Sequence, residues 1–182
     1  MTATMKTKII ELFKSNEPLP KLEYEYTTNQ HYKVQISHTK KSWTAKLVLT
    51  PLPEPVQKRF EEQLFAEHVE EPRAFTAIHN DEQIGWIQLG YEKWNNRMRV
   101  WEFLIKKEHR RKGIGTQLMQ HPIKLAKERG ARMLVLETQS CNTNAIQFYL
   151  KHGYELIGFD TTAYSNQDIE KNEVRLELGL KL

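Results

Sequence analysis

The stretch Glu108–Met119, EHRRKGIGTQLM, decides how the rest of the chain is interpreted. Two arginines and a lysine lead into two glycines spaced G-x-G, and an apolar helical pattern begins directly after them. The start of a helix leaves backbone N–H groups without intrahelical partners and carries a partial positive charge. Glycines let such a backbone approach a ligand closely, and neighbouring cations add charge-assisted hydrogen bonds. The stretch therefore predicts an anion site whose natural occupant is a phosphate or pyrophosphate.

Two better-known phosphate motifs are excluded. The stretch lacks the GxxxxGK[ST] pattern of a P-loop, and Leu118 stands where the dinucleotide-binding GxGxxG pattern needs its third glycine. By itself, a G-x-G after basic residues also suits a solvated loop in front of a surface helix. The remainder of the chain has to decide between these two interpretations.

Hydrophobic patterning around this stretch predicts an α/β (α+β) protein with a mixed, mostly antiparallel sheet. The helix after the glycines is expected to run to about Arg129 and to stop at Gly130, and a second helix over 142–153 is expected to stop at Gly153. Pro122 falls inside the first helix, where it removes a hydrogen bond, so we expect a bend near Leu118–Pro122. Strands are predicted over 31–37, 43–50, 73–80, 84–94, 98–107, 131–139, 154–164 and 172–180.

The first third of the chain gives weaker signals. We predict a short helix over 6–14 and irregular structure over 16–26, because prolines restrict the latter segment. Residues 51–69 open with prolines and then repeat apolar side chains at Val56, Phe60 and Leu64, which predicts a helix.

Two motifs in the expected order resemble the GNAT family of N-acetyltransferases. Arg110, Gly113 and Gly115 match the family's R/Q-x-x-G-x-G/A loop between a strand and a helix. The segment 142–154 matches N-x-x-A-x-x-x-Y-x-x-x-G-F/Y at Asn142, Ala145, Tyr149, Gly153 and Tyr154.

Within that family the chain is most similar to streptothricin acetyltransferases. The similarity includes "LETQ" at 136–139, "YSN" at 164–166 and "NE" at 172–173. Those enzymes carry adjacent acids in the strand before the glycine loop, whereas this chain has Trp101-Glu102 there. Their aromatic-rich last strand is replaced here by "VRLELGL". Both departures concern the acceptor pocket and leave the identity of the acceptor open.

The resemblance implies a GNAT fold with helices on both faces of the central sheet. It implies a single domain over 1–182, with a divergent part, 1–70, covering the acceptor side. The implied activity is direct transfer of an acetyl group from acetyl-CoA to a primary amine of a small molecule, such as a streptothricin-type antibiotic, with a role in antibiotic resistance. A non-catalytic acyl-CoA-binding module, or acetylation of a protein or polyamine amine, stays open.

The resemblance also assigns residue roles. Tyr149 would protonate the departing thiolate, and Glu102 would take the proton of the amine or hold a cationic acceptor. Strand alternation is expected to place Val100, Glu102 and Leu104 on one face. Glu137, Asp160 and Glu173 are further candidates for contacts with a basic acceptor. Contacts to the cofactor are implied for Phe103, Leu104, Ile105, Arg110, Arg111, Lys112, Gly113, Ile114, Gly115, Thr116 and Asn142.

Composition narrows the remaining classes. The 182 residues carry a formal net charge of +4 with cations and acids interspersed, so nucleic-acid binding is only weakly supported. No apolar run approaches the ~20 residues of a membrane span, and one cysteine, Cys141, excludes an internal disulfide. These features favour the cytoplasm. The seven histidines show no metal-ligand spacing, so no metal is expected, and a homodimer is left open.

Overall fold

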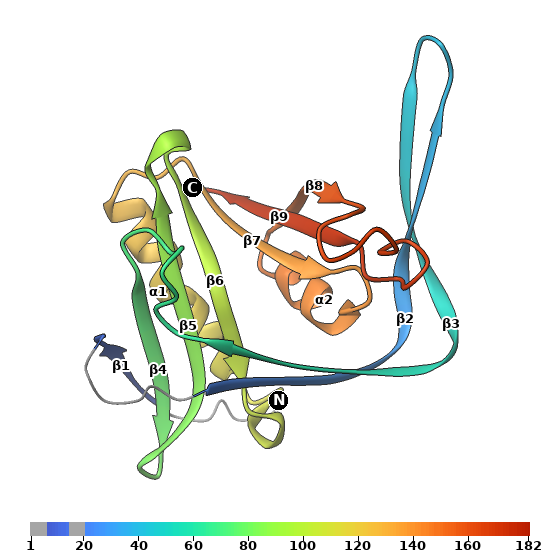
Figure 1. Cartoon of the computed structure of the whole chain (residues 1–182). Coiled ribbons are helices and arrows are strands. Elements are labelled where there is room, and N and C mark those ends of the chain that lie inside the picture. The colour runs from blue at the N-terminus through green and yellow to red at the C-terminus, as the bar shows by residue number, and fades with distance from the viewer. Residues whose placement is uncertain (1–6, 15–20) are drawn as a thin grey trace. The chain divides into compact units, whose positions relative to one another are not determined.

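The computed structural model describes residues 7–14 and 21–182, which form two compact units (Figure 1). The first unit contains the chain up to Glu25 together with Arg59–Leu136 and Leu180–Leu182. The second contains Tyr26–Lys58 and Glu137–Gly179. The expectation of a single domain over 1–182 stays a prediction. In the described part of the chain, no helix is both long enough and apolar enough to cross a membrane.

The first unit is built on an antiparallel meander, and the strands predicted over 73–80, 84–94 and 98–107 are confirmed. β4 (Arg73–His79), β5 (Glu82–Glu92) and β6 (Arg97–Ile105) pair in sequence, and β1 (Lys8–Leu12) pairs with β4 on the outer edge. The turn between β4 and β5 places Asn80 and Asp81 in the left-handed region, as a tight hairpin requires. β6 pairs in parallel with β7 (Met133–Gln139), so the sheet is mixed.

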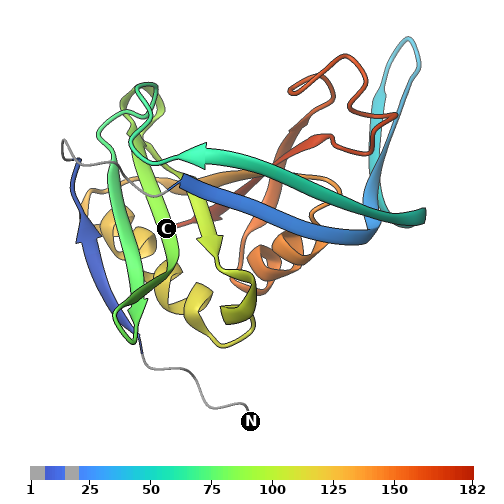
Figure 2. The same ribbon diagram turned by 60° about the horizontal axis from the view of Figure 1, so that its bottom comes forward.

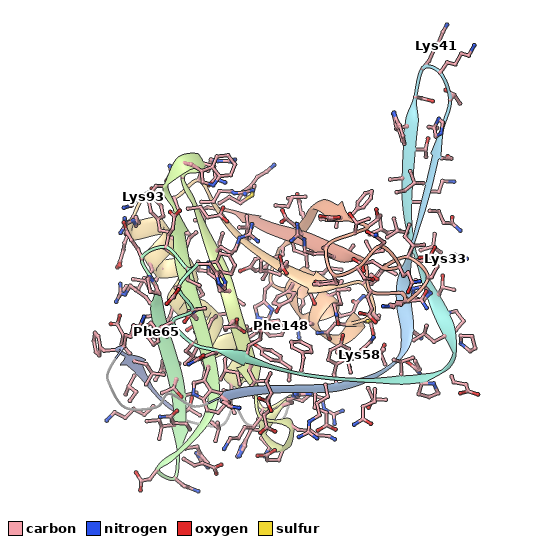
Figure 3. All side chains as sticks on the ribbon, in the orientation of Figure 1. Lys33, Lys41, Lys58, Phe65, Lys93 and Phe148 are labelled. Atoms are coloured by element: carbon pink, nitrogen blue, oxygen red, sulfur yellow. The ribbon has the colours of Figure 1, made fainter. Side chains whose placement is uncertain are left out.

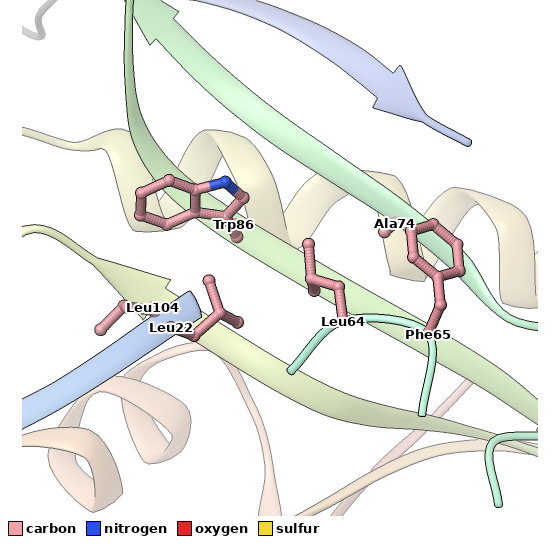
Figure 4. Packing of buried hydrophobic residues seen from close by; sticks show 6 residues of the cluster. All are labelled: Leu22, Leu64, Phe65, Ala74, Trp86 and Leu104. Carbon is pink, nitrogen blue, oxygen red and sulfur yellow. The ribbon is translucent and has the colours of Figure 1, made fainter. Parts of the chain in front are cut away.

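The two faces of this sheet are covered by different elements. α1 (Ile114–Glu128) connects the parallel strands β6 and β7 and packs against β4, β5 and β6. On the other side, the start of β2 (Lys21–His38) and the end of β3 (Trp43–Gln63) cross the strands (Figures 1 and 2). The second face is sealed by a buried apolar cluster of six residues, Leu22, Leu64, Phe65, Ala74, Trp86 and Leu104 (Figure 4).

Both helices end where their glycines predict. After α1, Gly130 adopts φ +69°, and the N–H groups of Gly130 and Ala131 bond the carbonyls of Lys127 and Ala126. α2 (Thr143–Lys151) ends in the same Schellman arrangement at Gly153, whose φ is +84°. α1 runs continuously through the buried Pro122. The bend expected near Leu118–Pro122 stays a prediction.

The second unit contains the last two strands of the seven-stranded sheet and most of the β2–β3 hairpin. β8 (Glu155–Asp160) and β9 (Arg175–Lys181) pair antiparallel, in the order β7-β9-β8. β2 and β3 form a separate two-stranded sheet, and the strands predicted over 31–37 and 43–50 are confirmed. A buried cluster of Val34, Ile146, Val174 and Leu176 joins the hairpin, α2 and β9 within this unit.

Three predictions for the first third of the chain are wrong. Lys8–Leu12 is a strand and not a helix, and Lys21–Tyr26, expected to be irregular, opens β2. Residues 51–63, expected to be helical, continue β3. A spacing of four residues in Val56, Phe60 and Leu64 fits one helical face, but it also fits one face of a strand, whose period is two. The parts of these predictions that fall on residue 6 and on 16–20 lie outside the described residues.

A substitution at Gly90 on β5 tests the packing of this first unit. A Cβ at Gly90 would lie 2.6 Å from Trp101 Nε1, 2.8 Å from Val69 Cγ1 and 3.0 Å from the Glu70 carbonyl oxygen. We therefore expect Gly90→Ala to lower the free energy of unfolding by about 1–3 kcal/mol, measured by urea denaturation.

Gly158→Ala is the matched control for that substitution. The nearest heavy atom to its added Cβ would be Glu177 Cβ at 4.0 Å, which is ordinary van der Waals contact. The control should change the free energy of unfolding by less than about 1 kcal/mol. Equal losses in the two variants would contradict the packing seen around Gly90.

Candidate active site

The glycine loop forms a concave backbone at the start of α1. Arg111 and Gly113 both adopt left-handed conformations, with φ of 61° and 82°. The first helical hydrogen bond runs from Gln117 N to Gly113 O at 3.1 Å, so the N–H groups of Ile114, Gly115 and Thr116 precede it. Left-handed residues beside a helix start turn successive N–H groups toward one point, which is the geometry of an anion site. A non-glycine residue at positive φ also marks a strained position, of the kind found at functional sites.

The side chain of Arg110 braces this loop by donating hydrogen bonds to two backbone carbonyls. Its Nε donates to the Ile105 carbonyl at 2.9 Å and its Nη1 to the Glu25 carbonyl at 3.0 Å. Two nitrogen atoms of the guanidinium are therefore engaged by backbone at the end of β6 and in β2. Arg111 and Lys112 are exposed, so the cationic side chains of the loop divide into one that holds the fold and two that face solvent.

The strand that leads into the loop separates from its parallel neighbour. β6 and β7 pair over four residue pairs, from Arg97↔Met133 to Val100↔Leu136, and β6 then continues to Ile105. The N–H of Phe103, beyond the last pair, donates to the hydroxyl of Tyr24 at 3.1 Å. The backbone edge of β6 over 103–105 is thus directed at groups other than β7.

A bulge in β6 changes which side chains share a face. Gln88 lies opposite Glu102 and Leu89 opposite Val100, so Trp101 is an extra residue in β6. Because residues opposite each other share a face and neighbours in a strand alternate, Val100 and Glu102 lie on different faces. The expectation that Val100 and Glu102 share one face is therefore wrong. Trp101 packs over Gly90 and meets the ring of His68 at 4.9 Å between centroids.

Glu102 is held by a residue that sequence reasoning missed. The hydroxyl of Tyr24 donates to Glu102 Oε2 at 2.7 Å, and the Tyr24 ring stacks on Phe60 with centroids 4.8 Å apart and planes 6° apart. The prolines before the segment "KLEYEY" favour irregular structure there, but the segment opens β2. The alternation of Leu22, Tyr24 and Tyr26 within it is the signal that would have indicated a strand with Tyr24 on the covered face.

The second unit carries Asn142 and Tyr149. Asn142 occupies the N-cap position of α2, and its carbonyl accepts the first helical hydrogen bond, from Ile146 N at 3.1 Å. Among the described residues, its side chain makes no capping hydrogen bond. Tyr149 is buried on α2, and burial raises the pKa of its phenol above the usual value. The phenol is therefore a proton donor at neutral pH.

The three further acids considered from the sequence are all ion-paired within the second unit. Arg175 lies 3.4 Å from both Glu137 and Asp160, and Glu173 pairs with Lys58, which Figure 3 labels. Cys141 is buried, and burial raises the pKa of its thiol. A buried thiol with a raised pKa carries little thiolate at neutral pH and is therefore a poor nucleophile.

Comparison with known families agrees with the fold and the loop. Residues 35–154 match the acetyltransferase (GNAT) family, which is more than half of the chain. The chain is therefore a member of the GNAT family of acetyltransferases. Two features of the structure agree with this family: β6 separates from β7, and the glycine loop lies at the start of α1.

The proteins that this chain resembles include streptothricin and nourseothricin acetyltransferases. A streptothricin acetyltransferase of Streptomyces lavendulae is 37% identical over 93 residues, 50% of this chain and 49% of that protein. A crystal structure assigned to a streptothricin acetyltransferase of Bacillus anthracis, in complex with acetyl coenzyme A, superposes with a TM-score of 0.78 at 25% identity, covering 97% of this chain and 100% of the other. A nourseothricin acetyltransferase structure gives 0.70 at 29% identity, covering 88% of each chain. The chain spans between about half and two thirds of the length of the curated relatives it matches first.

The bracing role of Arg110 predicts a specific loss of stability. Arg110→Lys removes the planar fork that reaches two backbone carbonyls, so the free energy of unfolding should fall by about 1–3 kcal/mol. Urea denaturation measures this. Arg111→Lys, at an exposed neighbour, is the matched control and should stay within about 0.5 kcal/mol of the wild type. Equal stability of the two variants would show that Arg110 does not brace the loop.

Proposed function

We propose that this protein transfers an acetyl group from acetyl-CoA to a primary amine of a streptothricin-type antibiotic. The observation that carries the proposal is the loop of left-handed backbone at Arg111 and Gly113, placed between β6 and α1 in a GNAT chain. Relatives named for streptothricin and nourseothricin acetylation, one of them solved with acetyl coenzyme A, support the donor and the acceptor class.

The residues of the first unit fit acetyl-CoA. The N–H groups at the start of α1, with the exposed cations Arg111 and Lys112, suit its pyrophosphate. The β6 edge beyond Val100 offers backbone groups to an extended pantetheine arm, because β7 has already separated there. The proposed cofactor contacts are Phe103, Leu104, Ile105, Arg110, Arg111, Lys112, Gly113, Ile114, Gly115, Thr116 and, in the second unit, Asn142.

Acetyl-CoA supplies the acetyl group already activated as a thioester. In the proposed reaction the Phe103 N–H polarises the thioester carbonyl, and Glu102 takes a proton from the attacking amine, directly or through one water. A nitrogen–carbon bond forms as the carbon–sulfur bond breaks. The phenol of Tyr149, which is protonated at neutral pH, protonates the departing thiolate.

A thiol-release assay with acetyl-CoA tests the proposal directly. Streptothricin, a polyamine and a peptide with a free N-terminal amine should be offered in parallel, each against a blank without amine. Rapid thiol release with streptothricin alone is the expected result. Faster thiol release with the polyamine or the peptide would identify that amine as the acceptor in place of streptothricin. Binding of CoA without thiol release for any amine would identify a non-catalytic module.

Tyr149 gives the sharpest mutational test of the mechanism. Tyr149→Phe keeps the buried ring but removes the proton donor, so kcat should fall by roughly 10²–10⁴-fold while the Kd for CoA, measured by calorimetry, stays the same. Tyr32→Phe is the matched control, because its hydroxyl accepts from Gln147 on the same helix at 2.8 Å. Unchanged turnover in Tyr149→Phe would remove this residue from the mechanism.

Gly113 tests the pyrophosphate loop. Gly113→Ala forces a side chain onto backbone at φ 82° at the start of α1, and the reshaped loop should raise the Kd for CoA by at least roughly tenfold. Gly130→Ala strains the other end of the same helix, at φ 69°, and meets no atom within 4 Å. This control should lose a similar amount of stability but bind CoA normally. Equal CoA affinity in the two variants would exclude the loop as the binding site.

A further inference from the structure

We propose that Tyr24 is a positioning residue that joins the carboxylate of Glu102 to the backbone amide of Phe103. The inference rests on the proposed function. In that function, Glu102 takes the proton of the amine and the Phe103 N–H binds the oxygen of the thioester carbonyl. All three residues lie in the first unit. Nothing in the glycine loop or in the segment 142–154 indicates Tyr24, because it comes from the divergent first third of the chain.

One hydroxyl makes both contacts with consistent chemistry. Tyr24 accepts from the Phe103 N–H at 3.1 Å and donates its only proton to Glu102 Oε2 at 2.7 Å. A hydroxyl has one donor and two acceptor sites, so the two bonds do not compete. The bond to the carboxylate is charge-assisted and therefore the stronger of the two.

The ring of Tyr24 is fixed by its surroundings. It stacks face to face on Phe60 and packs against the buried cluster that contains Leu22 and Leu104. Its chain neighbour Glu25 is tied down twice, by Lys107 Nζ at 3.3 Å from its carboxylate and by Arg110 Nη1 at 3.0 Å from its carbonyl. The start of β2 is therefore fastened to the loop that follows β6, which keeps the hydroxyl in place.

The amide that Tyr24 engages lies on the part of β6 beyond its pairing with β7. The phenol oxygen thus occupies the acceptor position that the proposed function gives to the thioester oxygen. Tyr24 covers this amide in the free protein and yields it to the thioester, while its proton continues to orient Glu102 toward the attacking amine. Removing the hydroxyl should impair use of the amine without weakening use of acetyl-CoA.

A double-mutant cycle separates this role from a structural one. The four proteins are the wild type, Tyr24→Phe, Glu102→Gln and the double variant, assayed for kcat/KM of the amine and KM of acetyl-CoA. We expect Tyr24→Phe to lower kcat/KM of the amine by roughly tenfold to a hundredfold, the scale of one hydrogen bond to a charged group. Acetyl-CoA KM should be unchanged or lower. In the Glu102→Gln background, Tyr24→Phe should cost little more, because the two act as one unit.

Tyr91→Phe is the matched control. It removes a hydroxyl hydrogen bond of the same length, 2.7 Å to Asn96 Oδ1, from the turn between β5 and β6, and should leave both constants unchanged. Additive effects of Tyr24→Phe and Glu102→Gln, or a rise in acetyl-CoA KM equal to the loss for the amine, would overturn the proposal. A wild type that transfers acetyl to no amine would instead refute the proposed function.

The amide resonance of Phe103 provides a readout that needs no turnover. In ¹⁵N-labelled protein, Tyr24→Phe should move this resonance in the direction of a lost hydrogen bond, and acetyl-CoA should move it in the wild type. A resonance that is the same in the wild type and in Tyr24→Phe would overturn the inference whether or not the enzyme acts on the amines offered.

Discussion

The early end of the pairing between β6 and β7 is the constraint on which the site depends. After Val100↔Leu136 the two strands no longer share a ladder, yet β6 continues as a strand to Ile105. Buried backbone groups on that edge need partners, since leaving one unpaired costs roughly 1–3 kcal/mol. The Tyr24 hydroxyl partners the Phe103 N–H and the Arg110 guanidinium partners the Ile105 carbonyl. Side chains from β2 and from the glycine loop thus satisfy this edge.

The bulge at Trp101 is the second feature of β6 that positions side chains of the candidate site. An extra residue in β6 puts Glu102 opposite Gln88, on the face that β2 crosses, and lets Trp101 pack over Gly90, where a larger residue would collide with it. In the structure, Trp101 packs over Gly90 of β5, whereas the carboxylate of Glu102 accepts a hydrogen bond from the hydroxyl of Tyr24.

The first third of the chain acts as a cover and as a source of one polar group. Leu22, Leu64 and Phe65 seal the face of the sheet opposite α1, and Tyr24 extends from the same strand as Leu22. Such a segment needs no short motif, because its task is met by alternating apolar side chains and one well-placed phenol. This explains how a stretch without a recognisable motif can contribute a side chain to the candidate site.

Local chemistry in the sequence predicted the strands β4 to β6, the stops of both helices and the glycine loop at the start of α1. Gly130 and Gly153 terminate helices through their own backbone freedom, and Gly113 forms the loop for the same reason. Tertiary structure decided that residues 51–63 extend a strand, since a four-residue apolar spacing satisfies either periodicity until a partner strand is present. It also decided the bulge at Trp101 and the bond from Tyr24 to Glu102. That bond joins residues 78 positions apart in the chain, which no local pattern connects.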